Sequence, residues 1–219
     1  MTILQAIILG IVQGLSEFLP ISSSAHIVFT QNICAVLNGS TIDLGSAQQV
    51  FLSIMLHVGT LIAVLIYFRK EVLEITKDFF KALWTRDFSS ANAKMGAFIL
   101  IGTVFTVLVA YPLKDVSEKL MVYPQMVAFL LIMTGIVLFF SEFKSKHQKE
   151  HTDKLSLKHA ILIGLAQGVA AFPGFSRSGW TIATGLFTGL DRVTSTKFSF
   201  LLVIPIILGT SIFYPMLEI

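Results

Sequence analysis

One segment of the chain occurs twice, and both copies carry polar residues inside otherwise apolar sequence. The identical positions keep a constant separation without a gap: they are Gly10 and Gly164, Gln13 and Gln167, Gly14 and Gly168, Phe18 and Phe172, Ser22 and Ser176, and Ser24 and Ser178. A proline interrupts each copy, Pro20 in the first and Pro173 in the second. Paired, interrupted apolar segments of this kind predict a binding site between two repeats of a membrane protein.

The composition also indicates a membrane protein. Hydrophobic residues make up 54% of the 219 residues, charged residues only 13%, and the mean hydropathy is +0.80. A soluble domain carries about 25% charged residues. Because no Pro/Gly/Ser-rich linker divides the chain, we expect a single membrane domain over residues 1–219. Cys34 is the only cysteine, so an internal disulfide is excluded.

Four apolar stretches have about the length that a bilayer requires, residues 51–68, 96–113, 122–140 and 198–217. The second repeat copy is different, because its two apolar arms, 160–172 and 179–190, are each too short to cross. They predict a re-entrant helical hairpin with its tip at Pro173. The first copy predicts a second such hairpin, broken at Pro20. The expected fold is therefore an all-α membrane protein with two re-entrant hairpins and about four full spans.

The positive charges predict the orientation of these segments, because cytoplasmic loops are rich in Lys and Arg. The chain has sixteen Lys and Arg residues, and all but three of them fall on one predicted side of the membrane. The exceptions are Lys114, Lys119 and Arg177. Since three spans separate the hairpins, the first should open outward and the second toward the cytoplasm. The cytoplasmic cations account for the pI of 9.0 without a nucleic-acid partner, although they also attract anionic membrane lipids.

The repeat has an expected domain organisation: residues 1–140 form the first repeat and 157–219 a second, apparently incomplete and inverted one. Gly59 and Thr60 recur as Gly209 and Thr210, so the span at 198–217 matches the span at 51–68. The spans at 96–113 and 122–140 have no counterparts after Ile219. We therefore expect either a longer native chain or self-association, as a homo-oligomer, through residues 198–217.

Arg177 is the residue with the strongest functional indication. An arginine inside a bilayer costs about 2.5–3.5 kcal/mol on insertion scales, so it needs an anionic partner or an aqueous cavity. One interpretation is a buried structural pair with Glu17. The other is an anion site, because Gly174 lets the backbone approach a ligand, and Ser176 and Ser178 can cap a helix whose N-terminus favours an anion. Further hydroxyls for such a phosphate site lie at the other tip, on Ser22, Ser23 and Ser24.

Glu17 and Gln13 are four residues apart and so share one helix face. Their oxygens suit Mg²⁺ or Ca²⁺, which commonly bridge a carboxylate and substrate phosphates. Ser23 and His26 are three apart, a spacing that would let His26 activate a Ser23 nucleophile, or act itself as nucleophile or proton donor. A hydrogen-bonded structural role for His26 is the alternative.

The other histidines have simpler interpretations. His57 either supports the predicted site from a neighbouring helix or is an interfacial histidine with its hydrogen bonds satisfied. His147, His151 and His159 belong to the predicted basic cytoplasmic segment, where we expect them to be solvated.

The segment from Gln13 through Glu17 and Ser22-Ser23-Ser24 to His26, together with Pro173-Gly174, Ser176-Arg177-Ser178 and Thr181, closely resembles the undecaprenyl-diphosphate phosphatases, or bacitracin-resistance proteins. The resemblance covers essentially the whole chain. Carried over by position, it implies a Glu/Gln-x-x-x-Glu motif at Gln13 and Glu17, a serine cluster at Ser22–Ser24, a histidine at His26 and an arginine at Arg177. Gln13 is Glu in some members, which predicts a weaker metal site here.

The resemblance implies a multi-pass enzyme of the bacterial inner membrane that removes one phosphate from undecaprenyl diphosphate. It would thereby recycle the lipid carrier for cell-wall synthesis and confer bacitracin resistance. The expected catalytic residues are Glu17, Ser23, His26 and Arg177. Substrate binding is expected from Ser22, Ser24, Gly174, Ser176, Arg177, Ser178 and Thr181, and a divalent cation at Glu17 and Gln13. The alternatives are a flippase for a phosphorylated polyprenyl lipid, because inverted repeats also build transporters, and a non-catalytic anion-binding subunit.

Overall fold

The computed structural model describes residues 3–37, 47–148 and 151–217, with side chains except at 47–50 and 213–217. The described helices are α1 (Ile3–Ser16), α2 (Ser23–Leu37), α3 (Ala47–Tyr67), α4 (Arg69–Thr85), α5 (Ala91–Met121), α6 (Pro124–His147), α7 (Leu157–Val169), α8 (Arg177–Phe187) and α9 (Arg192–Leu217). This part of the chain contains no strand, only one isolated bridge between Thr152 and Leu190. The predicted all-α fold class is confirmed.

Three of the predicted spans are confirmed by helices that are long and apolar enough to cross a membrane. These are α5, α6 and the Arg192–Ile212 part of α9. The fourth, predicted at 51–68, corresponds to α3, which meets the same criterion only jointly with α4, and the two are bent by 81° at the break between them. The molecule is a multi-pass membrane protein.

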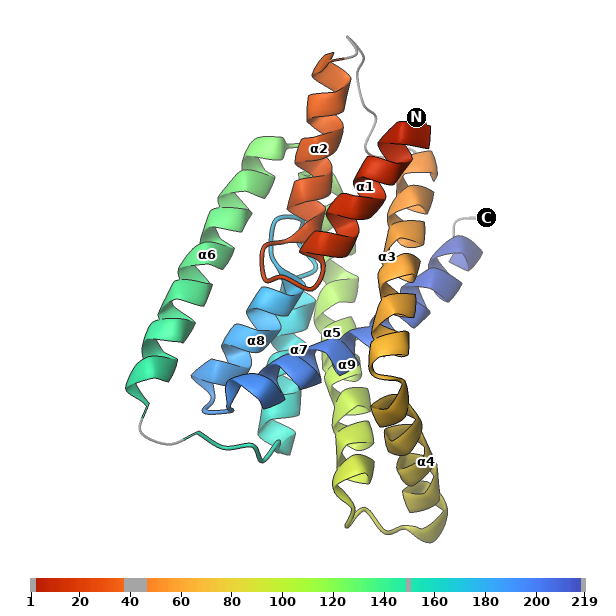
Figure 1. Ribbon diagram of the computed structural model, residues 1–219, viewed down its shortest axis with the longest axis vertical. Helices are drawn as coiled ribbons and strands as arrows, with labels where there is room; N and C mark the ends of the chain where they lie inside the picture. The colour runs from red at the N-terminus through yellow and green to blue at the C-terminus, as the bar shows by residue number, and fades with distance from the viewer. Residues whose placement is uncertain (1–2, 38–46, 149–150, 218–219) are drawn as a thin grey trace.

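The two repeat copies form two short helical hairpins that open toward opposite ends of the molecule (Figure 1). Helices α1 and α2 make the first, and α7 and α8 the second. Their tips lie side by side about halfway along the molecule (Figure 1). The predicted helix breaks are confirmed, since α1 ends before Pro20 and α7 before Pro173. Insertion of the hairpins into a bilayer from opposite sides stays a prediction.

The first tip ends in an unusual backbone conformation. Ser22 has a φ of 66°, in the left-handed region, and it is followed at once by α2. The Ser22 hydroxyl accepts a hydrogen bond from the backbone N–H of Ala25, which caps the new helix. The chain therefore reverses sharply between Glu17 and Ser23, and this reversal brings the start of α2 back beside the end of α1.

Helix α4 was not expected, because the sequence analysis treated its Lys and Arg residues as part of a loop. Its buried face consists of Ile75 and Ala82, with Phe79 packed against Gly96 of α5. These apolar residues recur at helical spacing, whereas charged residues occupy the remaining faces. The segment is therefore an amphipathic helix held against α5.

Two further boundaries differ from expectation. Helix α5 continues past the predicted end at residue 113 to Met121. Helix α7 begins at Leu157, because Ser156 and His159 form a reciprocal capping box at its start. His159 is consequently buried, and its predicted solvation is wrong, whereas His147 and His151 are exposed as expected.

The second hairpin is clamped between α5 and α6, and this clamp positions Arg177. On one side, a Cβ added to Gly164 of α7 would lie 2.4 Å from the carbonyl oxygen of Gly102 on α5, so the two backbones are in direct contact. On the other side, α6 packs along α8. Around the equivalent glycine of the first copy, Gly10, no atom of the described residues lies within 4 Å of an added Cβ, so this close helix contact is absent there.

Candidate functional site

The two hairpin tips are hydrogen-bonded to each other. The backbone N–H of Gly174 donates to the Ser24 hydroxyl at 3.3 Å, and the Ser178 hydroxyl donates to the carbonyl oxygen of Leu19 at 3.2 Å. Both contacts join residues of the first copy to residues of the second. The predicted meeting of the two polar tips is therefore present in the structure.

Glu17 and Arg177 form an ion pair at this junction. The distance from Arg177 Nη2 to Glu17 Oε1 is 2.7 Å, and the side chains are only 23% and 10% exposed. The pair that the sequence analysis gave as a structural alternative is thus formed. It uses one nitrogen of the guanidinium, and no other hydrogen bond of that group is made to the described residues. Since a guanidinium has five N–H donors, Arg177 can also hold a second anion.

The second carboxylate oxygen of Glu17, Oε2, lies close to three further side chains. Gln13 Nε2 donates to Oε2 at 3.0 Å, and the Ser23 hydroxyl donates to it at 2.5 Å. The His57 Nε2 atom lies 3.9 Å from the same oxygen. Ser23 is six residues beyond Glu17, and the turn at Ser22 makes this contact possible. The carboxylate is therefore placed to accept the Ser23 proton.

His26 is oriented by its own helix rather than by Ser23. Its Nδ1 atom lies 2.8 Å from the carbonyl oxygen of Ser22, four residues earlier. A neutral imidazole in this position carries its proton on Nδ1, which leaves Nε2 as the unprotonated nitrogen. No hydrogen bond joins His26 to Ser23 among the described residues, so the pairing suggested by their spacing is replaced by the bond from Ser23 to Glu17.

The two tips repeat one pattern of serine hydrogen bonds. The hydroxyls of Ser22 and Ser24 are 3.1 Å apart in the first tip, and those of Ser176 and Ser178 are 3.3 Å apart in the second. Ser176 is the N-cap of α8 and accepts from the backbone N–H of Gly179. Each tip therefore ends in a capped helix N-terminus, the arrangement that favours an anion.

Two of the predicted binding residues contact neighbouring helices behind the second tip. Gly174 has a φ of 100°, and a Cβ there would lie 2.4 Å from the Val127 carbonyl oxygen, so its backbone packs directly against α6. Thr181 is fully buried, and its hydroxyl lies between the carbonyl oxygen of Arg177 and the hydroxyl of Ser199. Their contacts therefore lie close to Arg177 in the chain.

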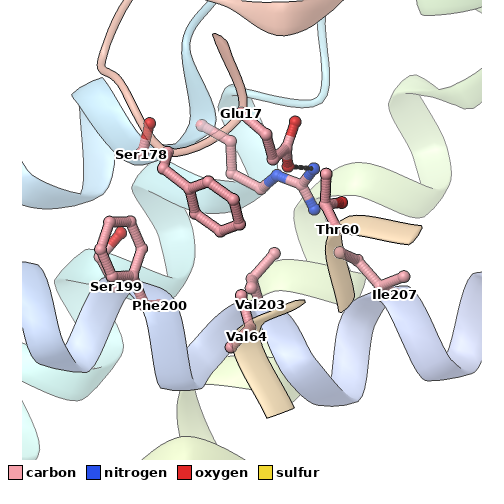
Figure 2. Close-up of a pocket in the computed structure, with 10 residues that line it drawn as sticks. Glu17, Thr60, Val64, Ser178, Ser199, Phe200, Val203 and Ile207 are labelled. Atoms are coloured by element: carbon pink, nitrogen blue, oxygen red, sulfur yellow. Dashed lines mark hydrogen bonds and ion pairs between the residues drawn. The ribbon is translucent and has the colours of Figure 1, made fainter. Parts of the chain in front are cut away.

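A cavity opens beside the ion pair (Figure 2). Its polar lining comes from Glu17, Arg177, Ser178, Thr60 and Ser199, and its apolar lining from Phe18, Val64, Phe200, Val203 and Ile207. In Figure 2, Val64 and Val203 lie on the side away from Glu17, where α3 and α9 face each other. The site therefore combines a charged end with an apolar wall.

The residues of α3 and α9 that line this cavity were not predicted from the sequence. The one available signal was the recurrence of Gly59-Thr60 as Gly209-Thr210, which relates these two helices. It indicated equivalent spans but not that their apolar faces would line the site.

The donors for a divalent cation are few. Among the described residues, no three His, Cys, Asp or Glu side chains gather into a metal-binding group. However, the Gln13 Oε1 atom is buried and has no hydrogen-bond partner in the part of the chain that the structure describes, while the Gln13 amide nitrogen donates to Glu17. One carboxylate and one unsatisfied amide oxygen fit a hard cation whose remaining ligands come from substrate and water.

Comparison with known proteins decides the family. The family model described as bacitracin resistance protein BacA matches residues 6–218. The chain belongs to this family. It is similar to undecaprenyl-diphosphatase 2 of Halalkalibacterium halodurans, with 40% identity over 215 residues that cover 97% of this chain and 73% of the relative.

Two further relatives agree with this assignment. Undecaprenyl-diphosphatase 1 of Pseudoalteromonas translucida is 40% identical over 214 residues, covering 98% of this chain and 76% of that protein. Undecaprenyl-diphosphatase of Methanosphaera stadtmanae is 38% identical over 220 residues, covering 96% and 76%. The resemblance found in the tip residues thus extends along nearly the whole chain.

Proposed function

We propose that this protein is an undecaprenyl-diphosphate phosphatase, which releases the terminal phosphate and leaves undecaprenyl phosphate. The observation that carries the proposal is the contact of Glu17 with both Arg177 and Ser23. An acceptor for a proton, a hydroxyl nucleophile and an anion-binding guanidinium are joined at one cavity. The names of the relatives supply the substrate.

Arg177 and the N-terminus of α8 hold the diphosphate in this proposal. The guanidinium binds phosphate oxygens in a planar, bidentate manner, and the N–H groups at the start of α8 favour negative charge. The hydroxyls of Ser22, Ser24, Ser176 and Ser178 provide further donors around the tips. As charge builds on the phosphoryl oxygens during transfer, these fixed donors stabilise it.

Ser23 acts as the nucleophile. Its oxygen attacks the terminal phosphorus, its proton passes to Glu17 Oε2, and the bond from phosphorus to the bridging oxygen breaks, so that undecaprenyl phosphate leaves. Water then hydrolyses the phosphoserine and releases phosphate. His26, whose Nε2 makes no hydrogen bond to the described residues, exchanges protons with the leaving group or the water.

A divalent cation, Mg²⁺ or Ca²⁺, is proposed at Glu17 and Gln13. The buried, unpartnered Gln13 Oε1 atom supports this position. When bound, the cation would neutralise charge on the diphosphate oxygens. The residues that bind the headgroup and transfer the proton remain Arg177, Ser23 and Glu17.

The apolar wall of the cavity suits a lipid substrate. An isoprenoid chain attached to the diphosphate would leave the charged end along the surfaces of Val64, Phe200 and Val203 without contacting water. The enzyme would act in the plasma membrane of a bacterium, where it recycles the carrier lipid for cell-wall synthesis and lowers sensitivity to bacitracin.

A flippase for the same lipid is the second candidate function. The two hairpins open toward opposite ends of the molecule, as the inverted repeats of transporters do (Figure 1). A flippase needs the anion site but no nucleophile. Purified protein in detergent has no two compartments, so phosphate released there reports hydrolysis alone.

The deciding experiment measures phosphate release from a C55 polyprenyl diphosphate in detergent, for the wild type and for Ser23→Ala. We expect release from the wild type and a loss of at least about a hundredfold in the variant. Ser141→Ala is the matched control, because among the described residues this buried α6 hydroxyl bonds only its own helix, at the carbonyl of Leu138. Absence of release from the wild type, with headgroup translocation in vesicles that survives Ser23→Ala, would favour the flippase.

A further inference from the structure

Thr134, in the middle of α6, contacts the second tip both before and after Arg177 in the chain. Its hydroxyl oxygen accepts the backbone N–H of Ser176 at 3.2 Å and the indole Nε1–H of Trp180 at 3.3 Å. The Thr134 hydroxyl lies 3.4 Å from the carbonyl oxygen of Gly174 and 3.2 Å from that of Leu130, to which it donates. The side chain is 1% exposed, so no water replaces these partners.

These partners bracket Arg177 in the chain. Ser176 is the residue immediately before it and the N-cap of α8, and Trp180 lies one helical turn after it. A Cβ added to Gly179 would lie 3.3 Å from the Thr134 Cγ2 methyl, so the methyl also touches this turn. The Thr134 side chain therefore holds the backbone from which the guanidinium extends.

Helix α6 also packs against α2, close to the first tip. Val127, two turns before Thr134, is fully buried against Ala25 and Val28 of α2. Helix α2 begins at Ser23, whose hydroxyl contacts Glu17. Helix α6 therefore contacts both the helix that presents Ser23 and the tip from which Arg177 extends. A rotation of the second tip on α6 would change the distance between Arg177 and Glu17.

We propose that Thr134 is a positioning residue for the hydrolysis, acting through Arg177. The inference rests on the proposed function and assigns Thr134 no contact with substrate. Its physical basis is that a misplacement of about 1 Å in a group that stabilises a transition state can lower the rate about a hundredfold. Without the Thr134 hydroxyl, the N–H of Ser176 and the indole N–H would be buried without partners, and the tip would shift to satisfy them.

The chain offers a closely matched control in Thr106 on α5. Thr106 is 3% exposed, accepts from Gln167 Nε2 at 3.2 Å, and donates to the carbonyl oxygens of Gly102 and Gly164. It therefore holds the other arm of the same hairpin with the same chemistry. Its partners outside α5 are Gly164 and Gln167 on α7, thirteen and ten residues before Arg177.

The test compares phosphate release by Thr134→Val, Thr134→Ser and Thr106→Val in detergent, with unfolding midpoints measured for each. We expect Thr134→Val to lose about tenfold or more in kcat/KM. Thr134→Ser keeps the hydroxyl and should stay within about threefold of the wild type. Thr106→Val should lower the unfolding midpoint by a similar amount while retaining activity. Equal activity losses in the two valine variants would overturn the inference.

A double-mutant cycle with Arg177→Lys separates positioning from a general structural effect. If Thr134 acts through Arg177, then Thr134→Val should cost little more once the guanidinium has been removed. Full additivity of the two losses would overturn the inference. If the wild-type protein itself releases no phosphate, the proposed function is wrong, and that outcome is distinct from a failure of the Thr134 inference.

A spectroscopic measurement covers the case in which Thr134→Val is poorly active for other reasons. The chain has two tryptophans, so Trp84→Phe leaves Trp180 as the sole reporter. We expect Thr134→Val to shift the Trp180 emission, since it removes the acceptor of the indole N–H, and Thr106→Val to leave it unchanged. An unchanged emission spectrum in the Thr134→Val variant would contradict the proposed positioning role of Thr134.

Discussion

Glu17 Oε1 lies 2.7 Å from Arg177 Nη2, although one residue ends the first arm of the first hairpin and the other begins the second arm of the second hairpin. This single contact joins the two repeat copies through charge. It also places the carboxylate between an anion-binding group and the Ser23 hydroxyl. The consequences of changing either partner are therefore chemical as well as structural.

Arg177→Lys should lower turnover about a hundredfold or more, because an ammonium cannot reproduce the planar fork that grips two phosphate oxygens. Arg192→Lys is the control, since Arg192 makes an ion pair of the same length with Glu142 at an exposed position. Phosphate release by the two variants is compared at equal protein concentration. Normal turnover in Arg177→Lys would show that the guanidinium does not serve the reaction.

Ser23→Ala and His26→Ala should separate binding from chemistry. The diphosphate is held in our proposal by Arg177 and the start of α8, which neither substitution touches. We expect the affinity for a non-hydrolysable diphosphate lipid to change less than about threefold, while turnover falls at least about a hundredfold. Titration binding and phosphate release are the two measurements. Loss of binding in step with turnover would contradict the assigned roles.

Gln13→Glu should lower the cation concentration that gives half-maximal activity, because a second carboxylate strengthens a site for a hard ion. Gln13→Ala should raise that concentration. Both are measured by adding Mg²⁺ or Ca²⁺ back to chelator-treated protein. A dose response that is identical in all three proteins would exclude Gln13 as a ligand.

Gly174→Ala should lower the unfolding midpoint and the activity together. The new Cβ would lie 2.4 Å from the Val127 carbonyl oxygen, and the φ of 100° is unfavourable for alanine, so a cost above about 1 kcal/mol is expected. Gly135→Ala, on the neighbouring helix, is the control because nothing lies within 4 Å of its added Cβ. Thermal unfolding in detergent checks both, and equal midpoints would contradict the close packing.

The orientation can be tested by labelling single cysteines in a Cys34→Ala background. An impermeant reagent added to intact cells should label Glu118→Cys, at the exposed end of α5, but not Ser89→Cys, at the other end of that helix. The charge distribution predicts that residue 89 lies on the cytoplasmic side. Labelling of position 89 from outside would overturn the predicted orientation.

The sequence predicted the hairpin tips well because proline and the repeat both mark them. It predicted the contacts within the site less well. Spacing rules apply along one continuous helix, so they paired Ser23 with His26. The contact of Ser23 with Glu17 depends instead on the left-handed backbone at Ser22, which no spacing rule detects.

Helix α4 was missed for a different physical reason. Its apolar positions, such as Ile75, Phe79 and Ala82, have helical spacing, but charged residues between them keep the segment polar on average. Thr134 was not identified, and Thr181 was expected to bind substrate rather than to contact Ser199, because a threonine within an apolar span usually bonds its own helix. Their contacts with the second tip appear only once α6, α8 and α9 are packed together.

The meeting of the tips has a consequence for the number of reaction centres. Counting along the repeat, the position of Glu17 is occupied in the second copy by Ala171, and that of Ser23 by Arg177. The duplicated backbone could in principle present two equivalent half-sites facing each other. However, the carboxylate of Glu17 is present only in the first copy and the guanidinium of Arg177 only in the second. Each chain therefore has one reaction centre, built from both copies. Neither copy contains a complete set of reactive groups. One equivalent of a tightly bound transition-state mimic per chain should therefore abolish phosphate release.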